Sequence, residues 1–420
     1  MEELLKRFST GVLQFQFYYP LFMAYLWMIG AFYYYLRWEK KAPPFTQPPT
    51  LSRYPLVTLM VPCYNEADNV DETVAALDKQ KYPNFEIIAI NDGSRDDTAM
   101  KLDLLSQRYR RLRVIHLATN QGKANALRVG ALMSKGEIIV GIDGDALLDE
   151  HATTWLVRHF LTGPRVGAVT GNPRIRTRSS LLGKIQVGEF SAIIGLIKRA
   201  QRIYGRVFTV SGVVAAFRKS ALHEVDYWNA STVTEDIDVS WRLQLNHWDI
   251  RYEPNALCWI LMPETLRGLF HQRVRWAQGG IEALLNYGKS VFSWRKRRMW
   301  GVCLEYLTSI IWAFTMFFAI VLWVLHYFAA LPDYLVVSSL VPGWHGVVLG
   351  TTCLLQFMVS LIIDARYEKG LGRYYYWMVW YPLAFWLLSV MTTLVAIPRA
   401  LKRRGKLHGR WTSPDRGLRP

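Results

Sequence analysis

The chain has 420 residues, 51% of them hydrophobic and 14% aromatic, and it carries a formal charge of +17 at pH 7. The basic residues flank long apolar stretches and do not form a reading element with stacking aromatics, which excludes a nucleic-acid-binding protein and is typical of cytoplasmic membrane flanks. The four cysteines, Cys63, Cys258, Cys303 and Cys353, lie far apart, which excludes a disulfide framework and a cysteine-ligated metal.

The first expected element is a membrane anchor. Residues 15–36 carry no charge, and a membrane helix needs about 20 such residues. This apolar run is longer than that of a signal peptide, and Arg37 follows it without a small-residue cleavage site. We therefore expect residues 1–45 to form an amphipathic start and a retained anchor.

Residues 53–262 alternate between strand and helix patterns. We expect helices over 69–80 and 123–134, and strands over 53–62, 85–92, 111–118 and 137–146. This alternation predicts an α/β fold with a mostly parallel, doubly wound sheet, in which ligands bind at the carboxyl ends of the strands. Three polar clusters follow these strands and are expected to meet at one edge: Asn65–Glu66, Asn91–Asp92 and Asp143–Asp145.

The pattern loosens after residue 146. We expect a strand and a loop over 167–180, two strands around a glycine turn over 208–222, and a helix followed by a strand over 240–259. Residues 264–285 are amphipathic, with aromatics and arginines, and are expected to lie in the membrane interface as part of an interfacial segment over 263–300.

Three further apolar stretches follow, over 306–325, 346–363 and 374–398, within a membrane region that we place at 301–400. Three complete spans after the anchor would put the basic tail, 401–420, outside a cytoplasmic membrane face, against the charge rule. One of the last two stretches is therefore expected to be interfacial or re-entrant. The candidates are the segment 335–363, which contains Pro342-Gly343, and a helix over 374–398, which contains Pro382 and many aromatics.

Two carboxylates stand one residue apart after the fourth strand. Asp143 and Asp145 have the spacing for one to bind a hard cation, Mg²⁺ or Mn²⁺, while the other holds ligand hydroxyls. The alternative is an ordinary Asp-Gly-Asp surface turn.

Two other strand-end or helix-start positions suit a nucleotide. Asp92 can accept an N–H from a base, and Lys123 stands at a helix N-terminus that favours a diphosphate. The alternatives are simple turns, with the lysine solvated.

The segment Thr234-Glu235-Asp236 precedes a helix, and Asp236 is a candidate general base for a sugar hydroxyl. The alternative is a threonine cap followed by an acidic first turn. Further on, Arg275 can neutralise a departing diphosphate and Trp276 offers a flat face to a sugar ring. The alternative there is an interfacial helix with aromatic and arginine anchors.

The ordered set of motifs resembles the processive, membrane-embedded family 2 glycosyltransferases, such as cellulose, chitin and hyaluronan synthases, and within them the bacterial branch that makes poly-β-1,6-N-acetyl-D-glucosamine. The resemblance covers nearly the whole chain. It rests on NDGS (91–94), NQGKA (120–124), GIDGDALLD (141–149), VTGNPRIRTRS (169–179), TEDID (234–238), MPETL (262–266), QRVRWAQGG (272–280) and RWTSPDRG (410–417).

The resemblance implies a GT-A catalytic domain and roles for individual residues. Asp236 is the expected base, with Glu235 and Arg275 as further catalytic residues, and Asp145 is the expected metal ligand. The expected substrate-binding residues are Asn65, Glu66, Asp92 (on uracil), Lys123 (near the diphosphate), Asp143, Asp145, Ser211 and Gly212 (at the acceptor pocket), Gln272 and Trp276.

The implied reaction transfers N-acetylglucosamine from UDP-N-acetylglucosamine to a growing β-1,6-linked polymer, with inversion and export through the membrane helices. The resemblance also implies a bacterial inner-membrane protein with a cytoplasmic catalytic domain in contact with membrane lipids, a small two-span membrane partner, and activation by cyclic di-GMP. No cyclic di-GMP module is visible in the sequence.

Four rival interpretations remain. Another polymer synthase, of the hyaluronan, chitin or cellulose type, would use the same residues and differ in its product. A lipid-linked single-sugar transferase has no need of the Gln-x-x-Arg-Trp motif at 272–276. A catalytically dead receptor has no need of the intact carboxylates, and a pure transporter has no use for a large α/β domain.

Overall fold

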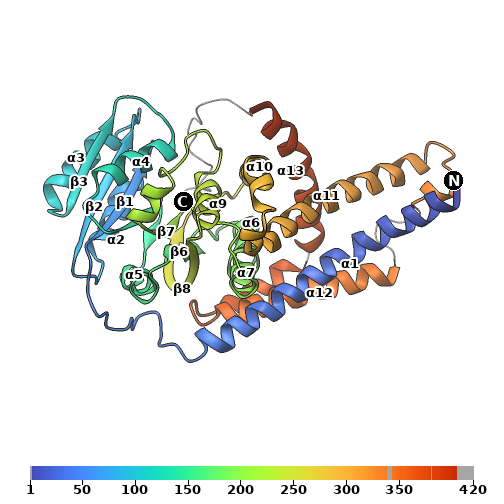
Figure 1. Ribbon diagram of the computed structural model, residues 1–420, viewed down its shortest axis with the longest axis horizontal. Helices are drawn as coiled ribbons and strands as arrows, with labels where there is room; N and C mark the ends of the chain where they lie inside the picture. Colours follow the sequence, from blue (N-terminus) through green and yellow to red (C-terminus); the bar gives the residue numbers. More distant parts are fainter. Residues whose placement is uncertain (1, 338–342, 380, 404–420) are drawn as a thin grey trace.

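The computed structural model describes residues 2–337, 343–379 and 381–403. Figure 1 shows an α/β domain built around one sheet, from which the long helices α1, α11 and α12 extend to one side. Of the basic tail predicted over 401–420, the structure describes only the first three residues, at the end of the last helix.

One mixed sheet of eight strands organises the domain, in the order β3-β2-β1-β4-β7-β6-β8-β5. Neighbours β3, β2, β1 and β4 are parallel, β7 runs antiparallel to both β4 and β6, and β6 is parallel to β8. The strands are β1(Val57–Cys63), β2(Phe85–Asp92), β3(Leu112–Leu117), β4(Ile138–Ile142), β5(Leu147–Leu148), β6(Val166–Ile175), β7(Val214–Arg218) and β8(Asp249–Ile260). The predicted mostly parallel α/β fold is therefore confirmed.

Both faces of the sheet are covered. Every residue of β1 is buried, as expected for a central parallel strand. Its side chains alternate between two apolar cores, with Leu59 and Val61 in one and Met60 in the other. The helices of this domain are α2(Val70–Asp78), α3(Thr98–Arg108), α4(Lys123–Met133), α5(Ala152–Thr162), α8(Lys219–Glu224) and α9(Glu235–Leu245).

The remaining helices form the second part of the molecule. They are α1(Glu2–Tyr34), η1(Tyr35–Glu39), α6(Leu181–Glu189), η2(Phe190–Leu196), α7(Ile197–Tyr204), α10(Leu266–Val291), η3(Trp294–Met299), α11(Trp300–His326), η4(Asp333–Leu335), α12(Gly343–Asp364), η5(Leu371–Met378) and α13(Tyr381–Arg403). Helix α1 packs on α7, α11 and α12, and α10 packs on α13. The amphipathic stretch predicted over 264–285 is thus a helix, six residues longer at its C-terminal end.

Within the described residues, three helical stretches are long and apolar enough to cross a membrane: Trp294–His326, Trp344–Asp364 and Ala384–Arg403. Helix α1 is not among them, because its apolar run is rich in tyrosine, which is less hydrophobic than leucine or isoleucine. The anchor over 15–36 therefore stays a prediction. So does the number of true spans.

Two sequence expectations were wrong. Residues 208–213 do not form a strand; only an isolated bridge joins Ser211 to Val214, because side chains from other elements hold this segment. The apolar stretch over 374–398 is not one helix but divides between η5 and α13.

A buried ion network joins the two parts of the molecule. The Arg199 guanidinium on α7 lies 2.6 Å from Glu39 on η1 and 3.0 Å from Asp364, at the end of α12. Asp364 also lies 2.6 Å from Arg174 on β6. All four side chains are almost fully buried, so each depends on its partners for charge compensation.

Candidate active site

Three polar clusters meet at one edge of the sheet, as the sequence predicted. Strands β1, β2 and β4 are parallel neighbours, so Asn65–Glu66, Asp92 and Asp143–Asp145 follow strand ends that lie side by side. Asn65 has a positive φ of 55° and accepts the Arg95 N–H, which joins the β1 and β2 loops. Of the residues in these three clusters, Asp143 lines the small cavity described below.

Asp92 supports a loop rather than opening onto a cavity. The side chain is fully buried, and its two carboxylate oxygens accept the N–H groups of Gln121 and Gly122, at 2.9 and 2.8 Å. Burial raises the pKa of Asp92, and these two hydrogen bonds oppose the rise. Asp92 therefore shapes the loop that leads into α4. Its contact with a uracil base stays a prediction.

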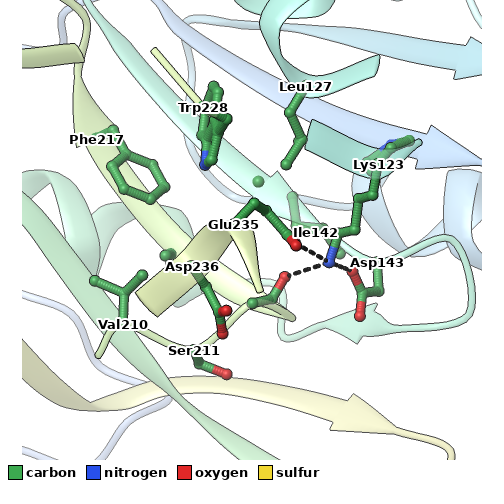
Figure 2. Close-up of a pocket in the computed structure, with 14 residues that line it drawn as sticks. Lys123, Leu127, Ile142, Asp143, Val210, Ser211, Phe217, Trp228, Glu235 and Asp236 are labelled. Carbon is green, nitrogen blue, oxygen red and sulfur yellow. Dashed lines mark hydrogen bonds and ion pairs between the residues drawn. The ribbon is translucent and has the colours of Figure 1, made fainter. Parts of the chain in front are cut away.

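Lys123 is the centre of the site. It is the first residue of α4, after Gly122 with a φ of 92°. Figure 2 shows its ammonium between three oxygens: Asp143 Oδ1 at 2.5 Å, Glu235 Oε1 at 3.1 Å and the Gly212 carbonyl at 3.0 Å. Burial alone would lower the pKa of Lys123, but the two carboxylates outweigh it and raise the pKa. The alternative of a solvated lysine is therefore excluded, and the contact of Lys123 with a diphosphate stays a prediction.

Asp236 lies on the first turn of α9, beside Glu235 and above the segment that contains Ser211 (Figure 2). An added Cβ on Gly212 would stand 3.1 Å from Asp236 Oδ2, so the glycine makes room for this carboxylate. Burial and the charge of Glu235 raise the pKa of Asp236 to about 6, against the effects of Lys123 and Arg275. A raised pKa near the operating pH suits a general base.

The alternative role of this segment as a helix cap does not hold. The Thr234 side chain makes no cap hydrogen bond to α9, and its hydroxyl is buried without a hydrogen-bond partner in the described structure. The acidic first turn still gains from the helix dipole. Glu235 is thus held by its ion pair with Lys123, and the charges of Glu235 and Asp236 are stabilised by the N-terminus of α9. A side-chain cap plays no part.

A small cavity of about 20 Å³ lies among these side chains. That volume accommodates about one water molecule and no sugar. Polar and apolar residues both line it, among them Lys123, Asp143, Ser211, Gly212, Glu235, Asp236, Phe217 and Trp228. The aromatic lining by Phe217 and Trp228 was not predicted, because no local pattern distinguishes these residues from ordinary core aromatics.

Helix α10 packs against α9, which carries Glu235 and Asp236. Arg275 on this helix is exposed, and its charge acts to lower the pKa values of both carboxyl groups. The Val233 N–H donates to Glu282 at 3.0 Å, which ties the start of the carboxylate segment to the same helix.

The other two residues of the predicted motif lie deeper. Trp276 is half-buried, with the Arg273 guanidinium 4.2 Å above its ring and Phe190 beside it. Gln272 contacts Met262 through a weak amide–sulfur hydrogen bond of 3.9 Å. The structure therefore brings Arg275 to the carboxylates, whereas Gln272 and Trp276 lie against the segment that follows β8 and against η2.

Gly279 sets how closely α10 approaches the carboxylates. An added Cβ there would stand 1.7 Å from the buried Thr234 hydroxyl, one residue before Glu235. We expect Gly279→Ala to push α10 away from α9, to cost about 1–3 kcal/mol in stability and to reduce turnover. Gly288→Ala on the same helix meets its nearest neighbour at an ordinary 3.5 Å and serves as the matched control. Equal activity in the two variants would contradict this role.

The donor set suits a divalent cation only in part. Asp143 and Asp145 are half-buried carboxylates, and one Asp143 oxygen already faces the Lys123 ammonium. Among the described residues, no group of three or more acidic, histidine or cysteine side chains is placed to hold a metal. Mg²⁺ is commonly bound by one or two carboxylates together with substrate phosphates. The residues present therefore fit a cation that enters with a diphosphate.

One buried amine behind the site escaped the sequence analysis. Lys198 on α7 donates to the Thr170 hydroxyl at 3.0 Å, and the same hydroxyl accepts the Ser211 N–H at 2.8 Å. Burial lowers the pKa of Lys198 to about 7, while Asp236 opposes the shift. This chain of contacts fixes the Ser211 backbone. Nothing in the sequence around residue 198 marks it, because its partners come from distant elements.

Comparison with known proteins agrees with this geometry. Residues 55–279 match the family described as "Glycosyltransferase like family 2". The chain is 39% identical to a poly-β-1,6-N-acetyl-D-glucosamine synthase of Staphylococcus epidermidis, over 97% of this chain and 98% of that protein. It is also 39% identical to the synthase of the same name from Staphylococcus aureus strain MSSA476, over 96% and 98% of the two chains.

A solved structure shares the fold. It is a mannosyltransferase from Pyrobaculum calidifontis in complex with GDP-Man and Mn²⁺, with a TM-score of 0.62. The match covers 93% of this chain and 99% of that one, at 19% sequence identity. At that identity the likeness concerns the fold alone.

Proposed function

The chain belongs to the glycosyltransferase-like family 2, and from this premise we propose that it transfers N-acetylglucosamine from UDP-N-acetylglucosamine to a growing poly-β-1,6-N-acetyl-D-glucosamine chain. The observation that carries the proposal is Asp236, a carboxylate with a raised pKa beside Gly212, in a chain that matches named synthases along nearly its whole length. The product is a biofilm exopolysaccharide.

In the proposed reaction the acceptor lies over Ser211 and Gly212. Its 6-hydroxyl oxygen forms a bond to the anomeric carbon of the donor sugar, and the bond from that carbon to the diphosphate breaks. The electron pair leaves with UDP, and Asp236 takes the hydroxyl proton. Attack from the face opposite the leaving group inverts the anomeric configuration.

The other residues stabilise charge. Arg275 neutralises the departing diphosphate, and preorganised charge of this kind gains strength where water is excluded. Lys123 holds Asp143 and Glu235 in place around the Gly212 carbonyl. Asn65 and Glu66 belong to the nucleotide side of the site, and Gln272 and Trp276 to the acceptor side. A divalent cation held by Asp145, with Asp143 beside it, would add further charge neutralisation on the diphosphate.

A second, larger cavity suits the growing polymer. It has a volume of about 360 Å³ and lies between α1, η2, α10, α11, α12 and α13. Its wall combines aromatic rings with hydroxyl and amide groups, a surface on which sugar rings can stack and hydrogen-bond. The residues that give it this character include Trp27, Trp312, Phe385, Trp386, Thr352 and Gln356. Polymer export through the helices is part of the proposal.

The role of Asp236 as base fixes the sign of the pH dependence. A base acts only when deprotonated, and the pKa of Asp236 lies at about 6. We expect the rate of polymer synthesis to be lost as pH falls through about 6, while UDP-N-acetylglucosamine binding persists. In Glu235→Gln the neighbouring negative charge is gone, so this acidic limb moves to lower pH. If the rate of synthesis falls at the same pH in Glu235→Gln as in the parent, Asp236 is not the group that causes the fall.

The membrane arrangement and the regulation also belong to the proposal. The chain lies in a bacterial inner membrane, and its catalytic domain faces the cytoplasm, the compartment in which UDP-sugars are made. The helices of the second part span or line that membrane. A small two-span subunit assists, and cyclic di-GMP activates synthesis.

The decisive test is polymer synthesis from UDP-N-acetylglucosamine in membrane vesicles, with and without the small subunit and cyclic di-GMP. Polymer that a β-1,6-specific hexosaminidase digests would support the full proposal. Resistant polymer would assign the chain to a chitin-type synthase, because hyaluronan and cellulose require sugar donors that this assay does not contain. Bound UDP-sugar without polymer would leave a single-sugar transferase or a receptor.

A further inference from the structure

A third cavity lies between α1, α7 and the start of α11. It shares no lining residue with the small cavity around Lys123 and Asp236. It has a volume of about 300 Å³. Phe22, Met23 and Leu26 on α1 and Val302 on α11 form an apolar wall. Val302 lies near the start of the stretch Trp294–His326, which is long and apolar enough to cross a membrane, so in a bilayer this wall would lie where the acyl chains begin.

The other end of the cavity is strongly basic. Arg206 and Arg298 both line it, one from the loop after α7 and one from η3. Burial lowers the pKa of Arg206, Asp249 opposes this shift, and the charges of Arg298, Arg202 and Arg165 add to it.

One acid lies within the cavity wall, and it is already bonded. Glu305 on α11 accepts the Trp27 indole N–H at 3.1 Å and the Gln201 amide at 3.2 Å. With Asp249 it offsets at most two of the four arginines. The basic end of the cavity therefore retains a net positive charge that an anion can neutralise.

Arg206 itself shows an unused hydrogen-bonding group. Its side chain is 8% exposed, and it donates from Nη1 to the Trp248 carbonyl and to Asp249. Its Nε–H is buried without a hydrogen-bond partner in the described structure. Phosphate oxygens are strong acceptors for arginine, and both Arg206 and Arg298 line the cavity.

We propose that this cavity binds an anionic phospholipid, with its phosphate between Arg206 and Arg298 and one acyl chain against Phe22, Met23 and Leu26. The apolar wall favours a lipid over a soluble phosphate, because a soluble anion would leave that wall in water. The bound lipid would join α1 to α11 at the membrane surface. This proposal does not depend on which sugar the enzyme transfers.

The test measures which lipids stay bound to the full-length chain. Protein extracted from vesicles of phosphatidylcholine and phosphatidylglycerol in equal parts is weighed by native mass spectrometry. We expect phosphatidylglycerol to be retained over phosphatidylcholine. Arg298→Gln should weaken its retention about fivefold, the equivalent of about 1 kcal/mol for one basic residue near an anionic surface.

Two matched controls separate a site from general attraction. Arg297→Gln removes the same charge from the same segment, at a residue that does not line the cavity, and should leave retention unchanged. Gly301→Leu places a side chain where an added Cβ meets nothing within 4 Å, fills the cavity and should abolish retention. Gly350→Leu on α12, also unobstructed, controls for added bulk on a membrane helix. Arg206 is not substituted, because it also holds the backbone at Trp248.

Three outcomes would overturn the proposal. Equal retention of the two lipids would remove the preference for an anion. Equal losses in Arg297→Gln and Arg298→Gln would reduce the effect to surface attraction. Displacement of the lipid by inorganic phosphate would assign the arginines to a soluble phosphate compound.

Discussion

Asp236→Asn is expected to lower polymer synthesis by about 10²- to 10⁴-fold, the range that a positioned general base contributes. Asparagine keeps the size of the side chain but cannot take the acceptor proton. The space beside Gly212 and the position on the first turn of α9 stay the same. The loss should therefore fall on turnover, measured as incorporation of labelled N-acetylglucosamine into polymer.

Binding of the donor is the internal control for that variant. The nucleotide side of the site is proposed at the ends of β1, β2 and β4, whereas Asp236 comes from α9. We expect the affinity for UDP-N-acetylglucosamine, measured by calorimetry on the solubilised chain, to stay near that of the parent. Full polymer synthesis in Asp236→Asn would remove this residue as the base. Loss of donor binding would point to a folding defect instead.

Lys123→Met is expected to lower the free energy of unfolding as well as the activity. Removal of the ammonium leaves Asp143 and Glu235 close together without their shared counter-charge. Breaking a buried ion pair by removing one partner costs about 3–5 kcal/mol. The Asp143 side chain is 23% exposed, so we expect the lower end of that range. Denaturant unfolding of the solubilised chain measures the loss.

A second substitution tests the cause. Because Glu235 would be the more buried of the two stranded carboxylates, Lys123→Met with Glu235→Gln should recover part of the lost stability. Lys123→Arg keeps the charge and should retain more stability than Lys123→Met. If Lys123→Met unfolds at the same denaturant concentration as the parent, the three-way contact contributes nothing to the fold.

The sequence was most informative where structure is local. Runs such as FEIIAIND (85–92) end on polar residues, and the alternation of such runs with helices is enough to predict which strand ends meet. The 208–213 segment was predicted wrongly because its backbone bonds to the Ser240 and Thr170 hydroxyls, which lie on other elements. A local apolar pattern contains no information about such partners.

The same limit applies to the site. Lys123, Asp143, Glu235 and Asp236 could be proposed as site residues from the order of the motifs. The sequence could not show that the Lys123 ammonium contacts the Asp143 and Glu235 carboxylates and the Gly212 carbonyl, which lie on three different segments. Asp92 shows a second limit. Its position at a strand end predicted a ligand contact, but the sequence did not show that both of its oxygens also accept N–H groups of the loop before α4.

The ion network around Arg199 also decides what counts as a separable unit. A fragment over 53–262 would contain Arg174 and Arg199 but lack Glu39 and Asp364, which neutralise them. Two guanidiniums would then lose both their counter-charges and the helices that cover them, so this face of the fragment would be exposed to water. The boundary that composition draws between enzyme and membrane region is therefore not an energetic boundary. A catalytic domain cut at that boundary would not keep the surface that it has in the whole chain.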